Sequence, residues 1–188
     1  ETEQGVVTSF GNAARAGIAY LPRERKTQGI FAPLSVLDNL TVSALGRFAT
    51  LGVLAESRRR KEGMRLIAQS HVATAGLGTP IGALSGGNQQ KVFLGRLLAL
   101  NPRALVLNDP MRGVDLGAKQ DIYKILEQFA SDGGAVMLLS TELAELCLLC
   151  DRVAVFHNRA LGAVIERQSL DVQALIAAMF GQSGAARG

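Results

Sequence analysis

The chain has 188 residues and a formal net charge of +4, with 48% hydrophobic and 19% charged residues. This length fits one globular domain with a real core, and the modest charge does not by itself argue for nucleic acid. The densest basic run, 58–61, falls in an expected helix, so we predict a solvated face there rather than a DNA patch. No apolar run approaches the length of about twenty residues that spans a bilayer, and the start of the chain lacks a signal pattern. We therefore expect a cytoplasmic protein without direct membrane insertion.

Two cysteines have a spacing that can indicate a redox or metal site. Cys147 and Cys150 enclose two leucines in a segment with helical character, and the sequence has no second ligand pair for a tetrahedral metal. We expect buried free thiols. His71 and His157 stand alone in the sequence and have no predicted role.

The first predicted strand covers residues 17–21 and ends at Pro22. A charged loop follows at 23–29. Between residues 34 and 82 the sequence has helical character, with one helix opening at 35–40 and another at 57–75.

The stretch Leu84–Val92 predicts a helix start that faces a phosphate. Its glycines, Gly86 and Gly87, let the backbone come close to a ligand, and Ser85 is a good cap for the first turn. Free N–H groups and the positive end of the helix dipole favour an anion at such a start. Taken alone, a Ser-Gly-Gly tripeptide is more often an ordinary turn, so its interpretation depends on the motifs around it.

Two further strands are predicted after this helix. Residues 104–107 form an unbroken apolar run, which is typical of a parallel strand covered on both faces. Asn108 and Asp109 follow at its carboxyl end, where open α/β sheets bind ligands. A helix at 118–130 with an apolar face then leads to another buried strand at 135–139.

The last part of the chain predicts a hairpin and a short helix. Strands at 153–156 and 161–165 flank a turn at 157–159. A helix then covers 170–180, and we expect the Gly/Ala/Ser tail after it to be loose.

The order of these motifs resembles that of ABC-type ATPases. Leu84–Val92 looks like the family's signature motif, in the form found in the second ATPase half of bacterial sugar importers of the ribose, galactose and xylose type. It is followed by the related stretches 104–110 and 113–115, and the resemblance runs from about Ala14 to Val164. The resemblance implies an α/β fold, namely a partial P-loop NTPase (ABC ATPase) fold with a mostly parallel sheet, flanking helices and a helical subdomain.

By this resemblance the whole chain, 1–188, is a single incomplete ABC ATPase domain. Its α/β core covers 1–33 and 96–165, and the helical subdomain with the signature motif covers 34–95. A C-terminal helix and the loose tail cover 166–188. In the family, the helical subdomain docks the membrane partner.

The resemblance also implies roles for particular residues. The signature residues are implied to contact, in trans, an ATP held by a partner half: Leu84, Ser85, Gly86, Gly87, Asn88 and Gln89. The family has Asp and then Glu at positions 108 and 109, the first holding Mg²⁺ through water and the second polarising the attacking water. Asn108 keeps an oxygen for Mg²⁺ but loses the charge that suits it. Asp109 is the catalytic candidate. Its side chain is one methylene shorter than the family's Glu, so we expect it to be a weakened base for the attacking water.

Three further positions are compared with the family pattern. The residue after Pro22 is usually Gln or Glu and contacts the metal and the membrane subunits, whereas here it is Arg23, for which Glu24 substitutes only by moving. Thr141 stands where a His or Ser contacts the γ-phosphate, and the alternative is a helix cap. Asp115 is similar to an Asp that reaches across the dimer interface, and it too could be a helix cap.

The sequence contains no Gly-x-x-x-x-Gly-Lys-[Ser/Thr] loop to cradle the α- and β-phosphates of a nucleotide. Because a strand, loop and crossover helix need about thirty residues and only 16 precede Gly17, we expect the first strands and the Walker A loop to be absent. The chain alone is then expected to bind Mg-ATP weakly, if at all, and to show no turnover.

The predicted function is the ATP-binding, energy-coupling part of an ABC-type sugar import system, peripheral to the inner face of the cell membrane. The expected partners are a second ATPase half or a homodimer mate, together with membrane permease subunits, and the expected cofactors are ATP and Mg²⁺. The alternative is a non-catalytic, degenerate module that regulates or scaffolds a partner. A DNA-acting role rests mainly on charge and ranks below both.

Overall fold

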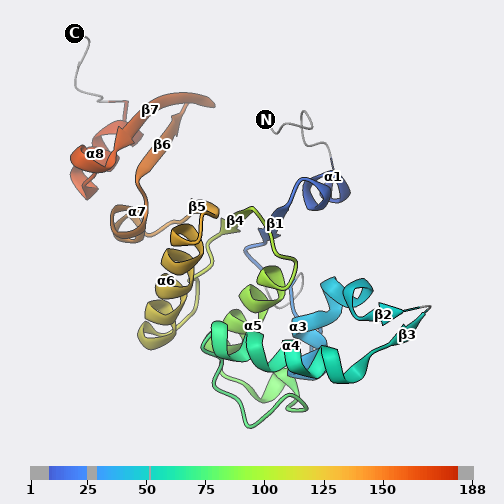
Figure 1. Cartoon of the computed structure of the whole chain (residues 1–188). Coiled ribbons are helices and arrows are strands. Elements are labelled where there is room, and N and C mark those ends of the chain that lie inside the picture. Colours follow the sequence, from blue (N-terminus) through green and yellow to red (C-terminus); the bar gives the residue numbers. More distant parts are fainter. Residues whose placement is uncertain (1–8, 25–28, 51, 182–188) are drawn as a thin grey trace. The chain divides into compact units, whose positions relative to one another are not determined.

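The computed structural model describes residues 9–24, 29–50 and 52–181. The chain divides into two compact units, Glu1–Leu139 and Ser140–Gly188, and each is described by itself (Figure 1). Within the described residues, no helix is both long enough and apolar enough to cross a membrane.

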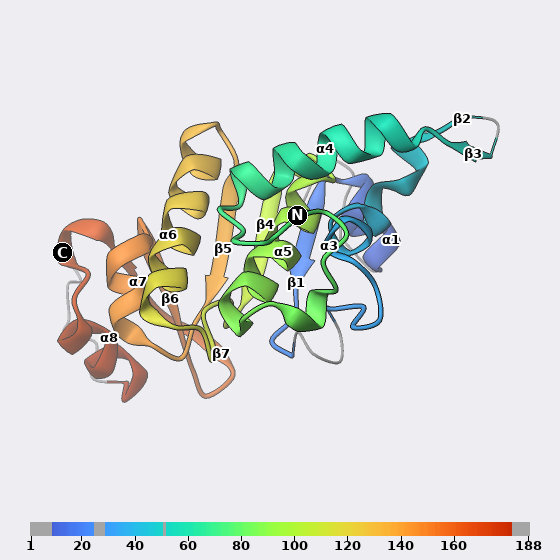
Figure 2. The ribbon, with the colours of Figure 1, turned by 90° about the horizontal axis from the view of Figure 1, so that it is seen from below.

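The first unit is built on a three-stranded parallel sheet with the order β1-β4-β5. These strands are Ile18–Leu21, Ala104–Asn108 and Ala135–Leu139. The helices α5 (Gly86–Leu98) and α6 (Leu116–Ser131) cover one face of this sheet, with α5 against β1 and α6 against β5 (Figure 2). The predicted strands, their parallel arrangement and the two helices are confirmed.

The other face of the sheet is more open than the sequence predicts. Leu105 and Leu107, which face the helices, are fully buried, whereas Met137 and Leu139 of β5 are 60% and 43% exposed. Successive side chains of a strand point to opposite faces, and the helices α5 and α6 cover only one of them. On β4, the residues of this face, Ala104 and Val106, are half-buried, so the prediction that the run 104–107 is covered on both faces is wrong for the described residues.

The region between β1 and α5 is mostly helical, as predicted. It contains α3 (Val36–Thr41), η1 (Val42–Arg47), α4 (Glu56–Gln69) and the short turn η2 (Ile81–Ala83). The α4 helix ends six residues before the predicted end at Ala75, because Ser70 caps it and His71 adopts a left-handed φ of 50°. A small hairpin of β2 (Ala49–Thr50) and β3 (Val53–Leu54) precedes α4 and was not predicted, and neither was the helix α1 (Phe10–Arg15).

A capping box fixes the start of α3. The Ser35 hydroxyl accepts a hydrogen bond from the Asp38 N–H, and the Asp38 carboxylate accepts one from the Ser35 N–H. Asp38 also pairs with Arg59 of α4, which ties the two helices together. Burial acts to raise the pKa of Asp38, but the hydrogen bonds from Ser35 and Arg59 outweigh it and lower that pKa.

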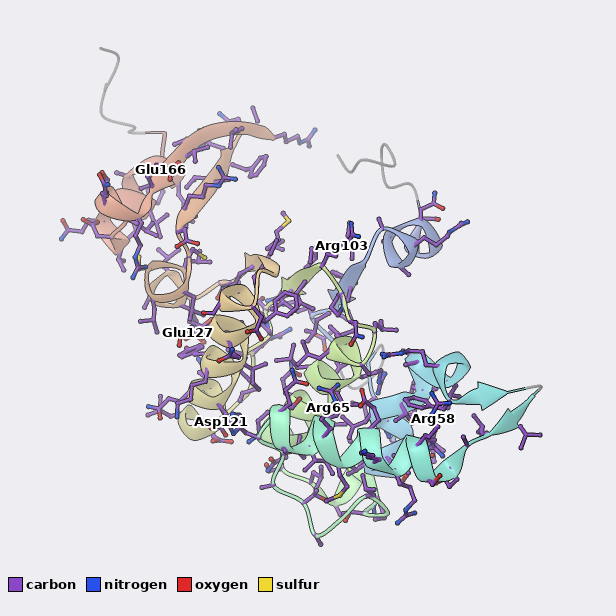
Figure 3. All side chains as sticks on the ribbon, viewed as in Figure 1. Arg58, Arg65, Arg103, Asp121, Glu127 and Glu166 are labelled. Carbon is purple, nitrogen blue, oxygen red and sulfur yellow. The ribbon has the colours of Figure 1, made fainter. Side chains whose placement is uncertain are left out.

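The basic run lies on the exposed side of α4, and Figure 3 shows Arg58 and Arg65 on this helix. Arg58, Arg60 and Lys61 are exposed, while Arg59 is half-buried by its pairing with Asp38. The prediction of a solvated face is confirmed for three of the four residues.

Arg96 of α5 links the signature helix to α3 and to the loop after the first strand. It donates to the backbone carbonyl of Asn39 at 2.5 Å, to the Asn39 side-chain oxygen at 2.8 Å, and to the carbonyl of Gly29. Its guanidinium lies over the rings of Phe31 and Phe93, each at 5.0 Å from the ring centroid. Burial lowers the pKa of Arg96 to about 10. This side chain therefore holds three segments in one arrangement.

The second unit consists of the predicted hairpin between two helices. The elements are α7 (Leu143–Leu149), β6 (Arg152–His157), β7 (Ala160–Glu166), η3 (Arg167–Ser169) and α8 (Val172–Met179). The strands β6 and β7 pair antiparallel, and their turn is made by two residues with positive φ, Asn158 and Arg159. The predicted tail beyond residue 181 lies outside the described residues.

The cysteines of the second unit are free, as predicted, but half-buried rather than buried. Burial raises the pKa of the Cys150 thiol, so it is less nucleophilic than an ordinary cysteine. Among the residues that the structure describes, no three His, Cys, Asp or Glu side chains are grouped to hold a metal ion. The Arg167 guanidinium donates instead to carbonyls at the end of α7, those of Cys147, Leu148 and Cys150.

Candidate functional site

The first candidate site is the signature corner, formed by the residues Leu84–Gln89 at the start of α5. Ser85 is the N-cap of this helix and is exposed, and its hydroxyl accepts hydrogen bonds from the Asn88 backbone at 3.4 Å and the Asn88 side-chain nitrogen at 3.1 Å. The Asn88 side-chain oxygen in turn accepts from the Ala73 N–H at 2.8 Å. The predicted helix start is confirmed, and Ser85 lies at the surface.

Gly87 has a packing role in this corner that the sequence did not reveal. It is buried, and a Cβ on it would lie 2.4 Å from the Ala118 Cβ and 2.9 Å from an Asp115 carboxylate oxygen. Only glycine therefore lets α5 approach the first turn of α6 so closely. As a result, the N-terminal ends of two helices lie side by side.

Asp115 is the N-cap of α6. Its carboxylate accepts a hydrogen bond from the Ala118 N–H at 3.0 Å, and the Asp115 backbone has the extended conformation of a cap. The cap interpretation is therefore observed directly. Its reach across a dimer interface stays a prediction.

Two other side chains of the motif hold the corner rather than face outward. The Gln89 amide donates to the carbonyl of Leu84 at 3.0 Å and to that of Ile81 at 3.4 Å. The Lys91 ammonium is 6% exposed and pairs at 2.7 Å with Asp121 of α6, which Figure 3 labels. This hydrogen bond lowers the pKa of Asp121. Lys91 thus joins α5 to α6 and is not directed at a ligand.

The second candidate site is the strand-end corner, formed by Arg23, Glu24, Asn108, Asp109 and Arg112. Asn108 is the last residue of β4, and the Asp109 N–H donates to the Leu139 carbonyl at 2.8 Å. Asp109 adopts a left-handed φ of 46°, which is uncommon outside glycine, and the Arg112 N–H donates to its carbonyl at 3.1 Å. The backbone therefore fixes the position of the Asp109 carboxylate.

Two ion pairs join the loop after β1 to the turn after β4. The Arg23 Nε lies 3.0 Å from an Asp109 carboxylate oxygen, and the Arg112 guanidinium lies 2.6 Å from the Glu24 carboxylate. The Asp109 side chain is only 7% exposed, whereas that of Arg23 is 46% exposed. The sequence singled out Arg23 and Asp109 separately, and the structure brings them together. The sequence analysis did not predict a site role for Arg112. The one feature of the sequence that could have indicated this pair is that Arg112 and Glu24 have opposite charges.

The strand-end corner does not offer the ligand set that a divalent cation prefers. Mg²⁺ takes oxygen ligands, and this corner supplies the Asn108 amide oxygen and the carboxylates of Asp109 and Glu24, each of which already faces a guanidinium. An arginine has only N–H donors and carries a fixed positive charge. The predicted weakening of the Mg²⁺ position at Asn108 stays a prediction, and the Arg23 contact supports it.

Thr141 belongs to the second unit, just before α7. The N-cap of α7 is Glu142, whose side chain makes no capping bond, so Thr141 lies one position before the cap. The helix-cap interpretation of Thr141 stays a prediction. The neighbouring Ser140 hydroxyl accepts a hydrogen bond from the Glu142 N–H at 3.0 Å and donates one to the buried Glu145 carboxylate at 2.7 Å. Because Ser140 and Thr141 are adjacent and both carry a hydroxyl, the sequence did not indicate that Ser140 makes these contacts. The phosphate-contacting role of Thr141 stays a prediction.

Comparison with known proteins decides the family. The family model described as ABC transporter matches residues 4–112, which is more than half of the chain. The chain belongs to the ABC transporter family. It is 40% identical to the ribose import ATP-binding protein RbsA 2 of Rubrobacter xylanophilus, over 97% of this chain and 37% of that protein. It is 39% identical to the ribose import ATP-binding protein RbsA of Geobacillus kaustophilus, over 93% of this chain and 35% of that protein.

This ABC transporter family chain thus spans little more than a third of the length of these curated relatives. The predicted resemblance to sugar-importer ATPases is confirmed, because both relatives are named as ribose import proteins.

Solved structures agree on the fold. A dimeric ATP-binding cassette in a post-hydrolysis state with ADP and Pi matches with a TM-score of 0.70 and 18% identity, over 86% of this chain and 68% of that one. A nucleotide-free ATP-binding cassette matches with a TM-score of 0.71 and 18% identity, over 88% of this chain and 66% of that one. At these identities the likeness shows the fold alone, and the predicted ABC ATPase fold is confirmed.

Proposed function

We propose that this chain is the ATP-binding, energy-coupling part of an ABC-type sugar import system, and that its signature corner closes on an ATP held by another cassette. ABC ATPases bind ATP with Mg²⁺, dimerise, and work with membrane permease subunits. The names of the curated relatives support the sugar import assignment. The observation that carries the in-trans role is the exposed, capped start of α5 beside the start of α6.

The chemistry of the signature corner suits a terminal phosphate. The first amides of a helix have no intrahelical acceptor, and the N–H groups of Gly86 and Gly87 make no hydrogen bond to the part of the chain that the structure describes. The Ser85 hydroxyl adds a further donor at the surface. Because Asp115 places a carboxylate close by, binding depends on these directed donors and on the helix dipole rather than on net positive charge.

The membrane-facing role is assigned to the helical region between β1 and α5. In this proposal that region, residues 34–95, docks permease subunits, so that closure of two cassettes moves the permease. The Arg96 contacts support such coupling, because they join α5 to Asn39 of α3 and to the loop at Gly29. The protein then works at the cytoplasmic face of the membrane.

The test measures nucleotide-dependent pairing of the full protein. Pairing is monitored by sedimentation velocity in the presence of a non-hydrolysable ATP analogue. Ser85→Arg fills the space in front of the first amides of α5, and we expect it to abolish nucleotide-dependent pairing. Ser57→Arg is the matched control, since Ser57 is an exposed serine in the first turn of α4. Equal pairing of Ser85→Arg and the unmodified protein would refute the in-trans role.

The alternative, a non-catalytic module that regulates or scaffolds a partner, is favoured by one observation, the contact between Arg23 and Asp109. The two candidates share the signature corner and differ in whether this corner supports ATP turnover by the full protein. Steady-state ATP hydrolysis by the full protein, with and without Ser85→Arg, separates them: a loss of turnover supports the energy-coupling ATPase, and unchanged turnover supports the module.

A further inference from the structure

The strand-end corner contains a protein cation where the family resemblance implies a metal-binding environment. The Arg23 guanidinium lies 3.0 Å from Asp109, at the carboxyl end of the central strand β4. A second ion pair, between Glu24 and Arg112, joins the same two segments with the charges reversed. Each segment thus contributes one cation and one anion.

The Asp109 carboxylate cannot relax away from this contact by a simple side-chain rotation into solvent. The side chain is 7% exposed, and the backbone on both sides is held by hydrogen bonds with Leu139 and Arg112. A buried carboxylate is strongly disfavoured unless a cation or hydrogen-bond donors face it. Arg23 supplies such a cation from a side chain that is itself half-exposed.

We propose that Arg23 is the resident cation of the strand-end corner and that it replaces a divalent ion there. The guanidinium donates to Asp109, which leaves fewer oxygen lone pairs for a metal, and its fixed charge repels a second cation at the same place. Asp109 is then an ion-pair partner and is not poised as a base for water. This assignment concerns the strand ends of this chain and does not depend on the in-trans role of the signature corner.

A consequence follows for the two corners of the chain. The signature corner can still contact a nucleotide that another cassette holds. The strand-end corner does not bind a divalent ion as long as Arg23 faces Asp109. Replacing Arg23 by a neutral side chain would remove the positive charge that faces the Asp109 carboxylate. The charge of residue 23, rather than its size, is the feature that keeps a divalent ion out.

The experiment measures binding of Mn²⁺, without nucleotide, to the full protein by electron paramagnetic resonance. Mn²⁺ prefers the same oxygen ligands as Mg²⁺ and is detected directly. The variants are Arg23→Gln, which removes the charge, Arg23→Lys, which keeps it, Asp109→Asn alone, and Asp109→Asn combined with each Arg23 variant. Thermal melting of every variant confirms that it is folded.

We expect Arg23→Gln to gain Mn²⁺ binding that Asp109→Asn removes, while Arg23→Lys binds no more Mn²⁺ than the unmodified protein. Asp109→Asn in the unmodified background is expected to leave Mn²⁺ binding unchanged. Either of two results overturns the proposal: a loss of Mn²⁺ binding when Asp109→Asn is introduced alone, or equal Mn²⁺ binding by Arg23→Gln and Arg23→Lys. A merely structural role of Arg23 would not produce the difference between these two variants.

Discussion

The signature corner and the strand-end corner lie in the same unit but are built in opposite ways. In the first, the motif bonds to itself over short distances, as Ser85 does with Asn88 and Gln89 with Leu84. In the second, charges far apart in the sequence pair with each other, Arg23 with Asp109 and Glu24 with Arg112. Local bonding leaves the first amides of α5 available, whereas the long-range pairs occupy the groups of the strand ends.

The two corners also differ in what supports them. The signature corner is held from behind by groups that no ligand would touch: the close contact of Gly87, the buried Lys91 pair and the Arg96 cluster. The strand-end corner is held by ion pairs of Arg23, Glu24 and Asp109, to which the family resemblance assigns site roles, and of Arg112, which it did not single out. Substitutions behind the first corner should therefore cost stability, and substitutions in the second should cost little.

The largest effect is expected for Arg96→Met. The substitution removes three hydrogen bonds and leaves the carbonyls of Asn39 and Gly29 without this donor in a buried place. We expect a loss of about 3 kcal/mol in the free energy of unfolding, measured by urea denaturation. Arg60→Met is the control, since Arg60 is exposed on α4, and it should change stability by less than about 0.5 kcal/mol. Similar values for both variants would show that the Arg96 cluster does not support the signature helix.

The next effect is expected for Gly87→Ala. A methyl group at this position meets the Ala118 Cβ and the Asp115 carboxylate at distances that neither backbone can accept without moving. We expect a loss of about 1–3 kcal/mol on the same denaturation measurement. Gly82→Ala has open space around it and serves as the control. If Gly87→Ala were as stable as Gly82→Ala, the two helix starts would not be in close contact.

The elements of the fold were largely predictable because their signals are local. The apolar runs of β1, β4 and β5, the glycines and serine at the start of α5, and the turn of the β6–β7 hairpin each lie within a few residues of one another. The missed elements are those too short to show a period: α1 has six residues, and β2 and β3 have two each. Burial was overestimated because an apolar run does not tell which face a helix covers.

The contacts of the candidate sites were less predictable because they depend on the fold. Nothing in the sequence near Arg23 indicates that its side chain contacts Asp109. Likewise, the sequence around Gly87 does not predict that Asp115 and Ala118 pack against it. The left-handed φ of Asp109 is likewise invisible in an apolar strand followed by Asn-Asp-Pro. Family resemblance singled out these positions one by one, but only the three-dimensional structure shows which of them touch.

A smaller effect is expected at the strand-end corner, where the coupling between Arg23 and Asp109 can be measured directly. The double-mutant cycle of Arg23→Gln and Asp109→Asn uses the free energy of unfolding from urea denaturation. We expect a coupling energy of only about 1 kcal/mol, because solvent screens the charge of the half-exposed Arg23. The Glu24 and Arg112 pair has both side chains more than half exposed, so its cycle should give less than about 0.5 kcal/mol. Additive effects of Arg23→Gln and Asp109→Asn would mean that the pair does not hold the corner in solution.

A similarly small effect concerns pH and the ion pair behind the signature corner. Lys91 lowers the pKa of Asp121 below its ordinary value of 3.8. A carboxyl group whose pKa is lower in the folded state contributes stability above the unfolded pKa, and this contribution is lost as the pH falls through the folded pKa. Because the Asp121 side chain is 32% exposed, we expect the contribution to be about 0.5 kcal/mol.

Asp121→Asn removes this titration, so unfolding measured between about pH 5 and pH 2 should show a shallower loss of stability than in the unmodified protein. Asp132→Asn is the control, since Asp132 lies at the other end of α6, where its carboxylate accepts a hydrogen bond from the Gln128 amide at 2.8 Å. The difference between the two variants at neutral pH should vanish at the lowest pH, where Asp121 is protonated in both states. A constant difference across the pH range would instead assign the effect of Asp121 to packing of α5 against α6, and the ion pair would no longer be part of what supports the signature corner.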